Sequence, residues 1–226
     1  KARHMVSQKV DILCNDLVSA YGEIAAQLQD VRQAESFRKT VSSARDLEQV
    51  LCHAMDWLLK EAGYCNIAIW LSGDEGKFEL GAYMKYTVVG DKRVTGALHS
   101  ALTQPTVREG FLHLSETEFN QMLAPADRKL LPAQTVMSAS CTYLGESLAT
   151  IMLFRDGKCP FRDEDEAMLK NVASVFATML ATMVRDDGED GPEAGPELFD
   201  DEPKNKKRKK ENNDADWWKR GEPPPF

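Results

Sequence analysis

An apolar side chain recurs every seven residues near the start of the chain, at Val10, Leu17, Ile24 and Val31. The intermediate positions are filled by Leu13, Cys14, Ala20, Tyr21 and Leu28, and no proline interrupts the run. A seven-residue repeat is typical of a coiled-coil seam, so the pattern predicts one helix over residues 6–40 that pairs with another helix. An amphipathic helix lying on its own domain is the alternative.

A second helix is predicted after a break in this pattern at residues 40–46. Apolar residues recur at i, i+3 and i+4 over residues 46–62, which is the stripe of a core-facing helix. Ser43 with Asp46 is interpreted as its N-terminal capping arrangement, and Gly63 as its end.

Short apolar or alternating runs then predict four strands. They cover residues 65–71, 78–86, 135–143 and 148–154. Between the second and third runs the pattern is mixed and predicts helices near residues 96–102 and 116–123, with a short extended piece at 111–114.

A closing helix is predicted from Asp163 to near Arg185, with Asp163 and Glu166 as a capping pair. Its apolar residues step alternately by three and four positions. This second coiled-coil-like stripe is predicted to join the first in a dimer interface: Leu169, Val172, Phe176, Met179 and Met183.

Residues 186–226 differ in composition from the rest of the chain. Residues 186–202 hold nine acidic residues and no basic one, which predicts disorder. A basic cluster follows, and the chain ends in two adjacent tryptophans and a terminal phenylalanine. These residues predict a docking segment: Lys206, Lys207, Arg208, Lys209, Lys210, Trp217, Trp218 and Phe226. A solvated charged linker, and tryptophans folded onto the domain, are the alternatives.

Residues 46–185 resemble a GAF domain, a small-molecule sensor module of signalling proteins. The resemblance rests on the helix and strand over residues 47–71, the tight turn and strand over 143–153, and the run from Pro160 to Glu166 before the last helix. It implies an α+β fold with a GAF-like, PAS-like antiparallel sheet of about six strands and the first and last helices on one face. The expected domains are a signalling helix (1–45), the GAF-like domain (46–185) and the tail (186–226).

The resemblance also implies a ligand pocket on the face of the sheet that carries the irregular segment. We expect aromatic and hydroxyl side chains to line it: Tyr83, Tyr86, Thr87, Phe111, His113, Ser138, Ser140 and Thr142. The alternatives are that these residues face solvent or that the pocket is filled by its own side chains. Phe154 and Arg155 stand where cyclic-nucleotide-binding members carry an Asn-Lys pair, so that ligand class is not expected.

Charge and cysteines narrow the function further. The net charge of −8 comes mostly from the tail, so the body has no nucleic-acid-binding field and nucleic acid is expected only through the basic segment. Five widely spaced cysteines predict neither a disulfide framework nor a zinc site, and four of them are interpreted as small buried residues of a cytoplasmic protein. No stretch suits a membrane-spanning helix, and no nucleotide-loop, metalloprotease or serine-hydrolase motif occurs.

The sequence therefore predicts a non-enzymatic regulatory protein without a cofactor or metal. It would be a homodimeric GAF-like sensor that binds an unidentified small molecule or a partner and signals through its dimer helices or its tail, where a protein partner docks. The alternative is an adaptor whose GAF-like core is a ligand-free dimerisation scaffold.

Overall fold

The computed structural model describes residues 2–73, 76–86 and 92–189. The chain divides into two units, Lys1–Arg185 and Asp186–Phe226, and the structure described below belongs to the first. Thr87 and all eight predicted docking residues of the tail lie outside the described residues, as does the predicted disorder of residues 190–202.

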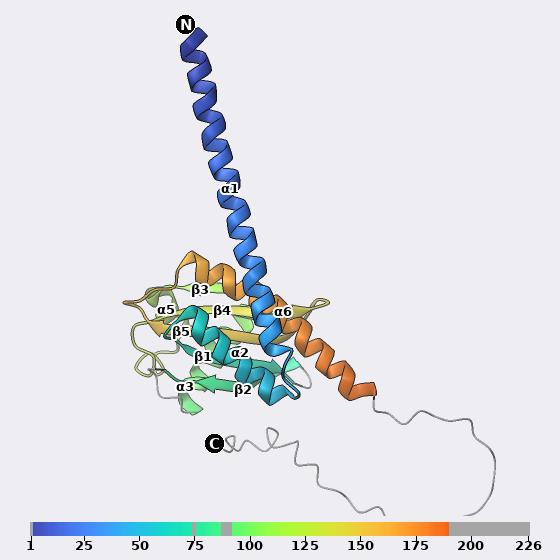
Figure 1. Cartoon of the computed structure of the whole chain (residues 1–226). Helices are drawn as coiled ribbons and strands as arrows, with labels where there is room; N and C mark the ends of the chain where they lie inside the picture. Colours follow the sequence, from blue (N-terminus) through green and yellow to red (C-terminus); the bar gives the residue numbers. More distant parts are fainter. Residues whose placement is uncertain (1, 74–75, 87–91, 190–226) are drawn as a thin grey trace, which may run out of the picture. The chain divides into compact units, whose positions relative to one another are not determined.

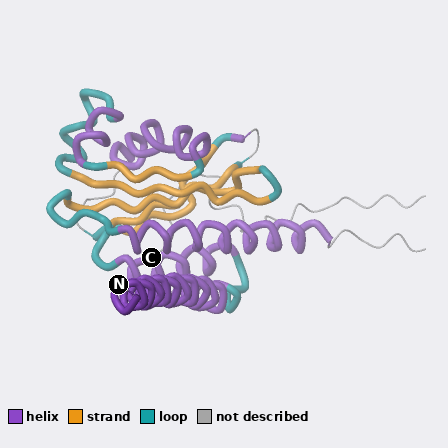
Figure 2. Tube along the Cα trace, turned by 90° about the horizontal axis from the view of Figure 1, so that it is seen from above, coloured by secondary structure: helices purple, strands orange, loops and turns teal. Residues whose placement is uncertain are grey.

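Five antiparallel strands form the sheet in the order β2-β1-β5-β4-β3. Long helices cover one face and short helical segments cover the other, which gives three layers (Figures 1 and 2). The elements are α1 (Ala2–Val41), α2 (Leu47–Ala62), β1 (Asn66–Ser72), β2 (Phe78–Met84), α3 (Lys92–Leu98), the π-helix η2 (His99–Thr103), α4 (Gln104–Glu109), β3 (Phe111–Leu114), α5 (Glu116–Met122), β4 (Gln134–Tyr143), β5 (Glu146–Asp156) and α6 (Asp163–Glu189).

The α+β fold class is confirmed, with a sheet of five strands among the described residues in place of about six. The helix predicted near residues 96–102 is present but extends further, because three short helical segments follow one another from Lys92 to Glu109. The tight turn between β4 and β5 is confirmed. Leu144 and Gly145 both have positive φ, 50° and 88°, as the twist of a two-residue hairpin requires.

The N-termini of α2 and α6 are capped differently from the prediction. Asp46 caps α2, because its Oδ1 accepts a hydrogen bond from the Gln49 backbone N–H at 2.8 Å, whereas Ser43 Oγ donates to the Thr40 carbonyl. At α6 the third residue, Asp165, reaches back, and its Oδ2 accepts a hydrogen bond from the Arg162 backbone N–H at 3.0 Å. In both cases a carboxylate at the start of the helix satisfies an otherwise unpaired amide.

The predicted dimer stripe on α6 is corrected by its burial. Leu169, Val172 and Phe176 are fully buried within this domain, and Met179 and Met183 pack against the same core. The stripe faces the sheet, so its three-and-four spacing serves the domain's own core. One described helical stretch, Asp163–Val184, is long and apolar enough by length and composition to cross a membrane, and 44% of its apolar 18-residue window is buried inside the domain.

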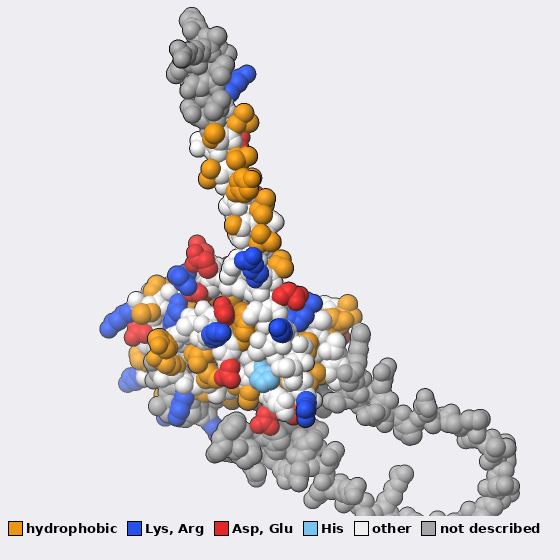
Figure 3. Space-filling view, viewed as in Figure 1, with side chains coloured by type: hydrophobic (Ala, Val, Ile, Leu, Met, Phe, Trp, Pro, Cys, Tyr) orange, Lys and Arg blue, Asp and Glu red, His pale blue; other side chains and the backbone are white. Residues whose placement is uncertain are grey.

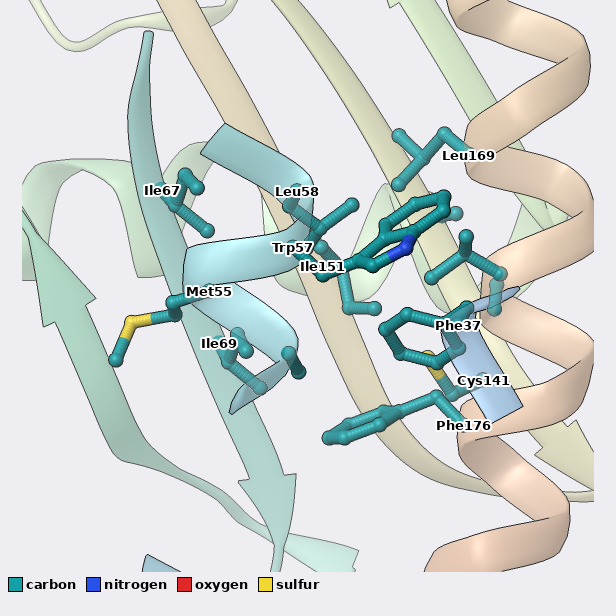
Figure 4. Packing of buried hydrophobic residues seen from close by; sticks show 14 of the residues in the cluster. Phe37, Met55, Trp57, Leu58, Ile67, Ile69, Cys141, Ile151, Leu169 and Phe176 are labelled. Carbon is teal, nitrogen blue, oxygen red and sulfur yellow. The ribbon is translucent and has the colours of Figure 1, made fainter. Parts of the chain in front are cut away.

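An aromatic contact joins three helices beneath the sheet. The Phe37 ring of α1 lies 5.1 Å from the Trp57 ring of α2 and 6.3 Å from the Phe176 ring of α6 (Figure 4). Trp57 Nε1 also donates a hydrogen bond to Ser36 Oγ at 3.1 Å. The end of α1 therefore belongs to the core of the domain, across the boundary expected at residues 45 and 46.

Replacing Phe37 with alanine tests this junction. We expect Phe37→Ala to lower the free energy of unfolding by about 3–5 kcal/mol, since a fully buried ring is removed from a packed core. Lys39→Ala, an exposed change on the same helix, should stay within about 0.5 kcal/mol of the parent. Urea unfolding followed by circular dichroism measures the free energy of unfolding of both variants. Equal losses of stability would contradict a role of Phe37 in joining the three helices.

Candidate functional site

Hydroxyl side chains gather on the sheet face that lies under the short helices. Side chains alternate along β4, so Met137 and Ala139 enter the core under the long helices while Val136 and Ser138 face the short ones. Ser140 Oγ lies 2.7 Å from Ser147 Oγ and 3.2 Å from Thr142 Oγ1. The structure thus brings the three predicted hydroxyl residues of β4 onto one face.

Thr106 of α4 completes this cluster. Its Oγ1 donates a hydrogen bond of 2.8 Å to Ser138 Oγ, and neither residue is exposed to solvent. Sequence reasoning missed Thr106, because no periodic pattern marks the short helices of residues 92–109. This bond ties the irregular segment to an interior strand of the sheet, since β4 lies between β5 and β3.

Two further hydroxyls are buried without a hydrogen-bond partner among the described residues, Thr103 Oγ1 and Thr150 Oγ1. Thr103 ends the π-helix and precedes Thr106 by three residues, which places it on the same side of the helical segment. Thr150 of β5 pairs in register with Ser140 and with Trp70. An unpaired buried hydroxyl costs about 1–3 kcal/mol, so these two groups mark the candidate ligand site.

Aromatic residues border the same face. Tyr83 of β2 packs beside Phe154, with 6.3 Å between the ring centroids. Trp70 lies 6.3 Å from the ring of His99 in the π-helix, whose Nε2 is 3.0 Å from the Phe78 carbonyl oxygen. Tyr83 is therefore placed on the face where the pocket is expected.

Three predicted pocket residues lie elsewhere. Tyr86 stacks on Tyr64 in an exposed pair, with 4.8 Å between the ring centroids. Phe111 and His113 of β3 pair with Ala139 and Met137, so both face the long helices. The alternation of a four-residue strand puts these two side chains on the face opposite to Ser138, which corrects the prediction.

Phe111 and His113 instead contact the start of α6. His113 Nδ1 lies 3.2 Å from Glu166 Oε2, and the Lys170 ammonium group lies over the Phe111 ring, 4.5 Å from its centroid. Lys170 Nζ also donates to Glu166 Oε1 at 2.6 Å. Hydrogen bonds from Lys170 and His113 hold the pKa of the Glu166 carboxyl below its usual value.

Arg155 joins β5 to the beginning of α6. Its guanidinium group donates to the carbonyl oxygens of Ala62 and Pro160 and to Asp165 Oδ2, the last at 3.2 Å. It also lies over the Phe161 ring, 4.0 Å from the centroid. Arg155 is thereby committed to packing these elements together, at the position where cyclic-nucleotide-binding members carry their Asn-Lys pair.

The cysteines divide into buried and accessible thiols. Cys65 and Cys141 are buried, and burial raises the pKa of Cys65 to about 12 and that of Cys141 further. Cys14 and Cys159 are exposed and Cys52 is half-buried, so only two of the five are fully buried, fewer than expected. Among the described residues, no group of three His, Cys, Asp or Glu side chains lies close enough to hold a metal ion.

An unpartnered apolar surface runs along α1. The predicted seam residues Leu17, Ile24, Leu28 and Val31 are exposed, and Figure 3 shows apolar side chains gathered along this helix. The side chain of Val10 lies outside the described residues. Large apolar residues in such a contiguous run are typical of an interaction surface.

Solved structures with the same arrangement identify the fold. The GAF domain of a phosphoenolpyruvate-protein phosphotransferase from Coxiella burnetii aligns with a TM-score of 0.58 at 16% identity, over 71% of this chain and 98% of that one. The nlh2 GAF domain from A. aeolicus aligns with a TM-score of 0.52 at 14% identity, over 70% and 99%. The chain has a GAF-like fold.

A domain of a sensor histidine kinase protein from Sinorhizobium meliloti also matches, with a TM-score of 0.53 and 12% identity over 66% of this chain and all of that one. No protein-family model matches the sequence, and no curated protein does. The GAF-like fold explains why the hydroxyl cluster and the long helices lie on opposite faces of one sheet.

A double-mutant cycle tests the bond at the centre of the GAF-like site. Thr106→Val leaves Ser138 Oγ buried without its donor, and we expect it to destabilise the domain by about 1–3 kcal/mol. Adding Ser138→Ala should recover part of that loss, because both polar partners are then gone. Thr117→Val, on an exposed residue of α5, is the control. Strict additivity in urea unfolding would contradict the bond.

Proposed function

We propose that this chain is a non-enzymatic regulatory protein in which a GAF-like sensor domain signals through a pair of α1 helices from two copies. Binding of a small molecule or partner would bias the arrangement of these helices. The observation that carries the proposal is the exposed apolar seam on a helix whose other end is buried in the sensor domain through Phe37.

The seam has the spacing of a two-stranded coiled coil. Leu17, Tyr21, Ile24, Leu28 and Val31 follow one another in steps of four and three, and each is more than half exposed. A left-handed coiled coil buries this repeat against a second copy of itself. Parallel pairing is the arrangement that brings two equivalent domains to the same end of the pair.

The solved structures support a regulatory role by their sources. They include the GAF domain of a phosphoenolpyruvate-protein phosphotransferase and a domain of a sensor histidine kinase protein. Enzymatic activity is not part of the proposal, and neither is a cofactor. The free cysteines agree with the reducing environment of the cytoplasm, where we place the protein.

The unpaired hydroxyls of Thr103 and Thr150 support a small polar ligand on the short-helix face of the sheet, because a bound molecule would supply their missing partners. The alternative function is a dimerisation scaffold without a ligand. It is favoured by the hydroxyl groups that already hydrogen-bond to one another, because these need no ligand as a partner. Thr106 bonds Ser138, and Ser140 bonds Ser147.

The tail adds a second proposed interaction. A protein partner would dock on the aromatic segment at Trp217, Trp218 and Phe226, while the basic residues from Lys206 to Lys210 supply charge and the only expected contact with nucleic acid. This assignment rests on the sequence, since these residues lie outside those that the structure describes.

Native mass spectrometry of the purified full chain tests both parts of the proposal. We expect a dimer that carries a discrete additional small-molecule mass. A dimer of the bare chain mass would favour the scaffold function, and a monomer at micromolar concentration would contradict the pairing of α1.

Two matched substitutions on α1 test whether the dimer forms through the apolar seam. Ile24→Asp buries a charge in the coiled coil and should weaken the dimer by about 100-fold or more, since an unpaired buried charge costs several kcal/mol. Ser19→Asp adds the same charge on the opposite side of the helix and should leave the dimer intact. Equal effects of the two changes on the dimer mass would place the interface elsewhere.

A further inference from the structure

The apolar face of α1 is wider than one coiled-coil seam. Leu13 and Ala20 border the seam on one side, and Val18 and Ala25 border it on the other. Exposure of the large residues ranges from 52% for Leu28 to 70% for Val18. At about 100° per residue, the apolar face spans roughly 140° of the helix.

A two-stranded coiled coil needs only the narrow stripe of two positions per heptad. A wider face is the pattern of a helix that contacts neighbours on both sides in a bundle. When two copies of α1 pair through the seam, the bordering residues Leu13, Ala20, Val18 and Ala25 stay at the edges of that pair. The pair therefore presents two further apolar grooves.

The charges along α1 indicate which kind of helix fits these grooves. Asp16, Glu23 and Asp30 recur every seven residues in a line beside Leu13 and Ala20. Residues 12–31 contain no lysine, arginine or histidine. Acidic residues that flank an apolar stripe select a partner helix with basic flanking residues, because flanking charges set partner choice in coiled coils.

We propose that each groove of the α1 pair binds an amphipathic helix of a partner protein, with a line of lysine or arginine beside its apolar stripe. Two such helices and the two α1 helices form a four-helix bundle. This inference rests on the proposed α1 dimer. The partner helix would then bind the same α1 helices whose arrangement the sensor domain changes.

Two other occupants fit the charge pattern less well. A second pair of α1 helices would bring further acidic lines to the groove with no basic residue between positions 12 and 31 to pair with them. The basic segment of residues 204–210 of this chain supplies charge and has no apolar residue to fill the groove.

The test uses the full chain and two synthetic four-heptad peptides. Both peptides carry leucine and isoleucine along one helical face, and they differ only in having lysine or glutamate beside that face. Fluorescence anisotropy should show the lysine peptide binding at least about tenfold more tightly than the glutamate peptide, with one peptide for each chain. Added salt should reduce this preference.

Charge-reversal variants locate the binding. The triple change Asp16→Lys, Glu23→Lys and Asp30→Lys should reverse the preference so that the glutamate peptide binds more tightly. The control makes the same change in net charge at exposed positions of α2: Glu48→Lys, Asp56→Lys and Glu61→Lys. It should leave the preference for the lysine peptide in place.

The outcomes separate this inference from the proposed function. A dimer that binds both peptides equally, binds neither, or reverses its preference in the α2 control overturns the partner helix and leaves the dimer standing. A chain that is tetrameric without peptide also overturns it, because further copies then fill the grooves. A monomeric chain overturns both proposals.

Discussion

The contact of Phe37 with Trp57 and Phe176 is the constraint on which this architecture depends. It anchors α1 to α2 and α6, the two other helices on that face of the sheet. Because Phe37 lies close to the end of α1, only the last turns of the helix are held by the domain. Residues 12–29 of the same helix are all exposed, so α1 is a long helix that the domain holds at its C-terminal end only.

The sheet separates the hydroxyl cluster from the long helices that hold α1. Alternate residues of β4 enter opposite cores, so Ser138 meets Thr106 under the short helices while Met137 belongs to the core under the long helices. The hydroxyl cluster and the core that holds α1 therefore lie on opposite faces of the same strand, so a shift of β4 on ligand binding would reach both. In the proposed function, ligand binding on one face shifts the pair of α1 helices between two arrangements through the other face.

Local patterns in the sequence predicted the strands, the β4–β5 turn and the start of α6 closely, because alternation and turn chemistry act over few residues. The same patterns misassigned Leu169, Val172 and Phe176, since a three-and-four stripe looks alike whether it faces its own sheet or another chain. The four-residue strand β3 was too short to reveal which face His113 takes. Thr106 and Thr103 lie in irregular helices whose packing depends on distant strands, so no local signal marks them.

Hydrogen exchange of the α1 amides, measured at several concentrations of the full chain, tests the central claim most directly. An isolated helical rod opens readily, whereas a paired one is protected by its partner. We expect slow exchange over residues 12–31 that becomes faster on dilution, while residues 37–41 stay protected by the domain core. Fast exchange over residues 12–31 at every concentration would contradict it.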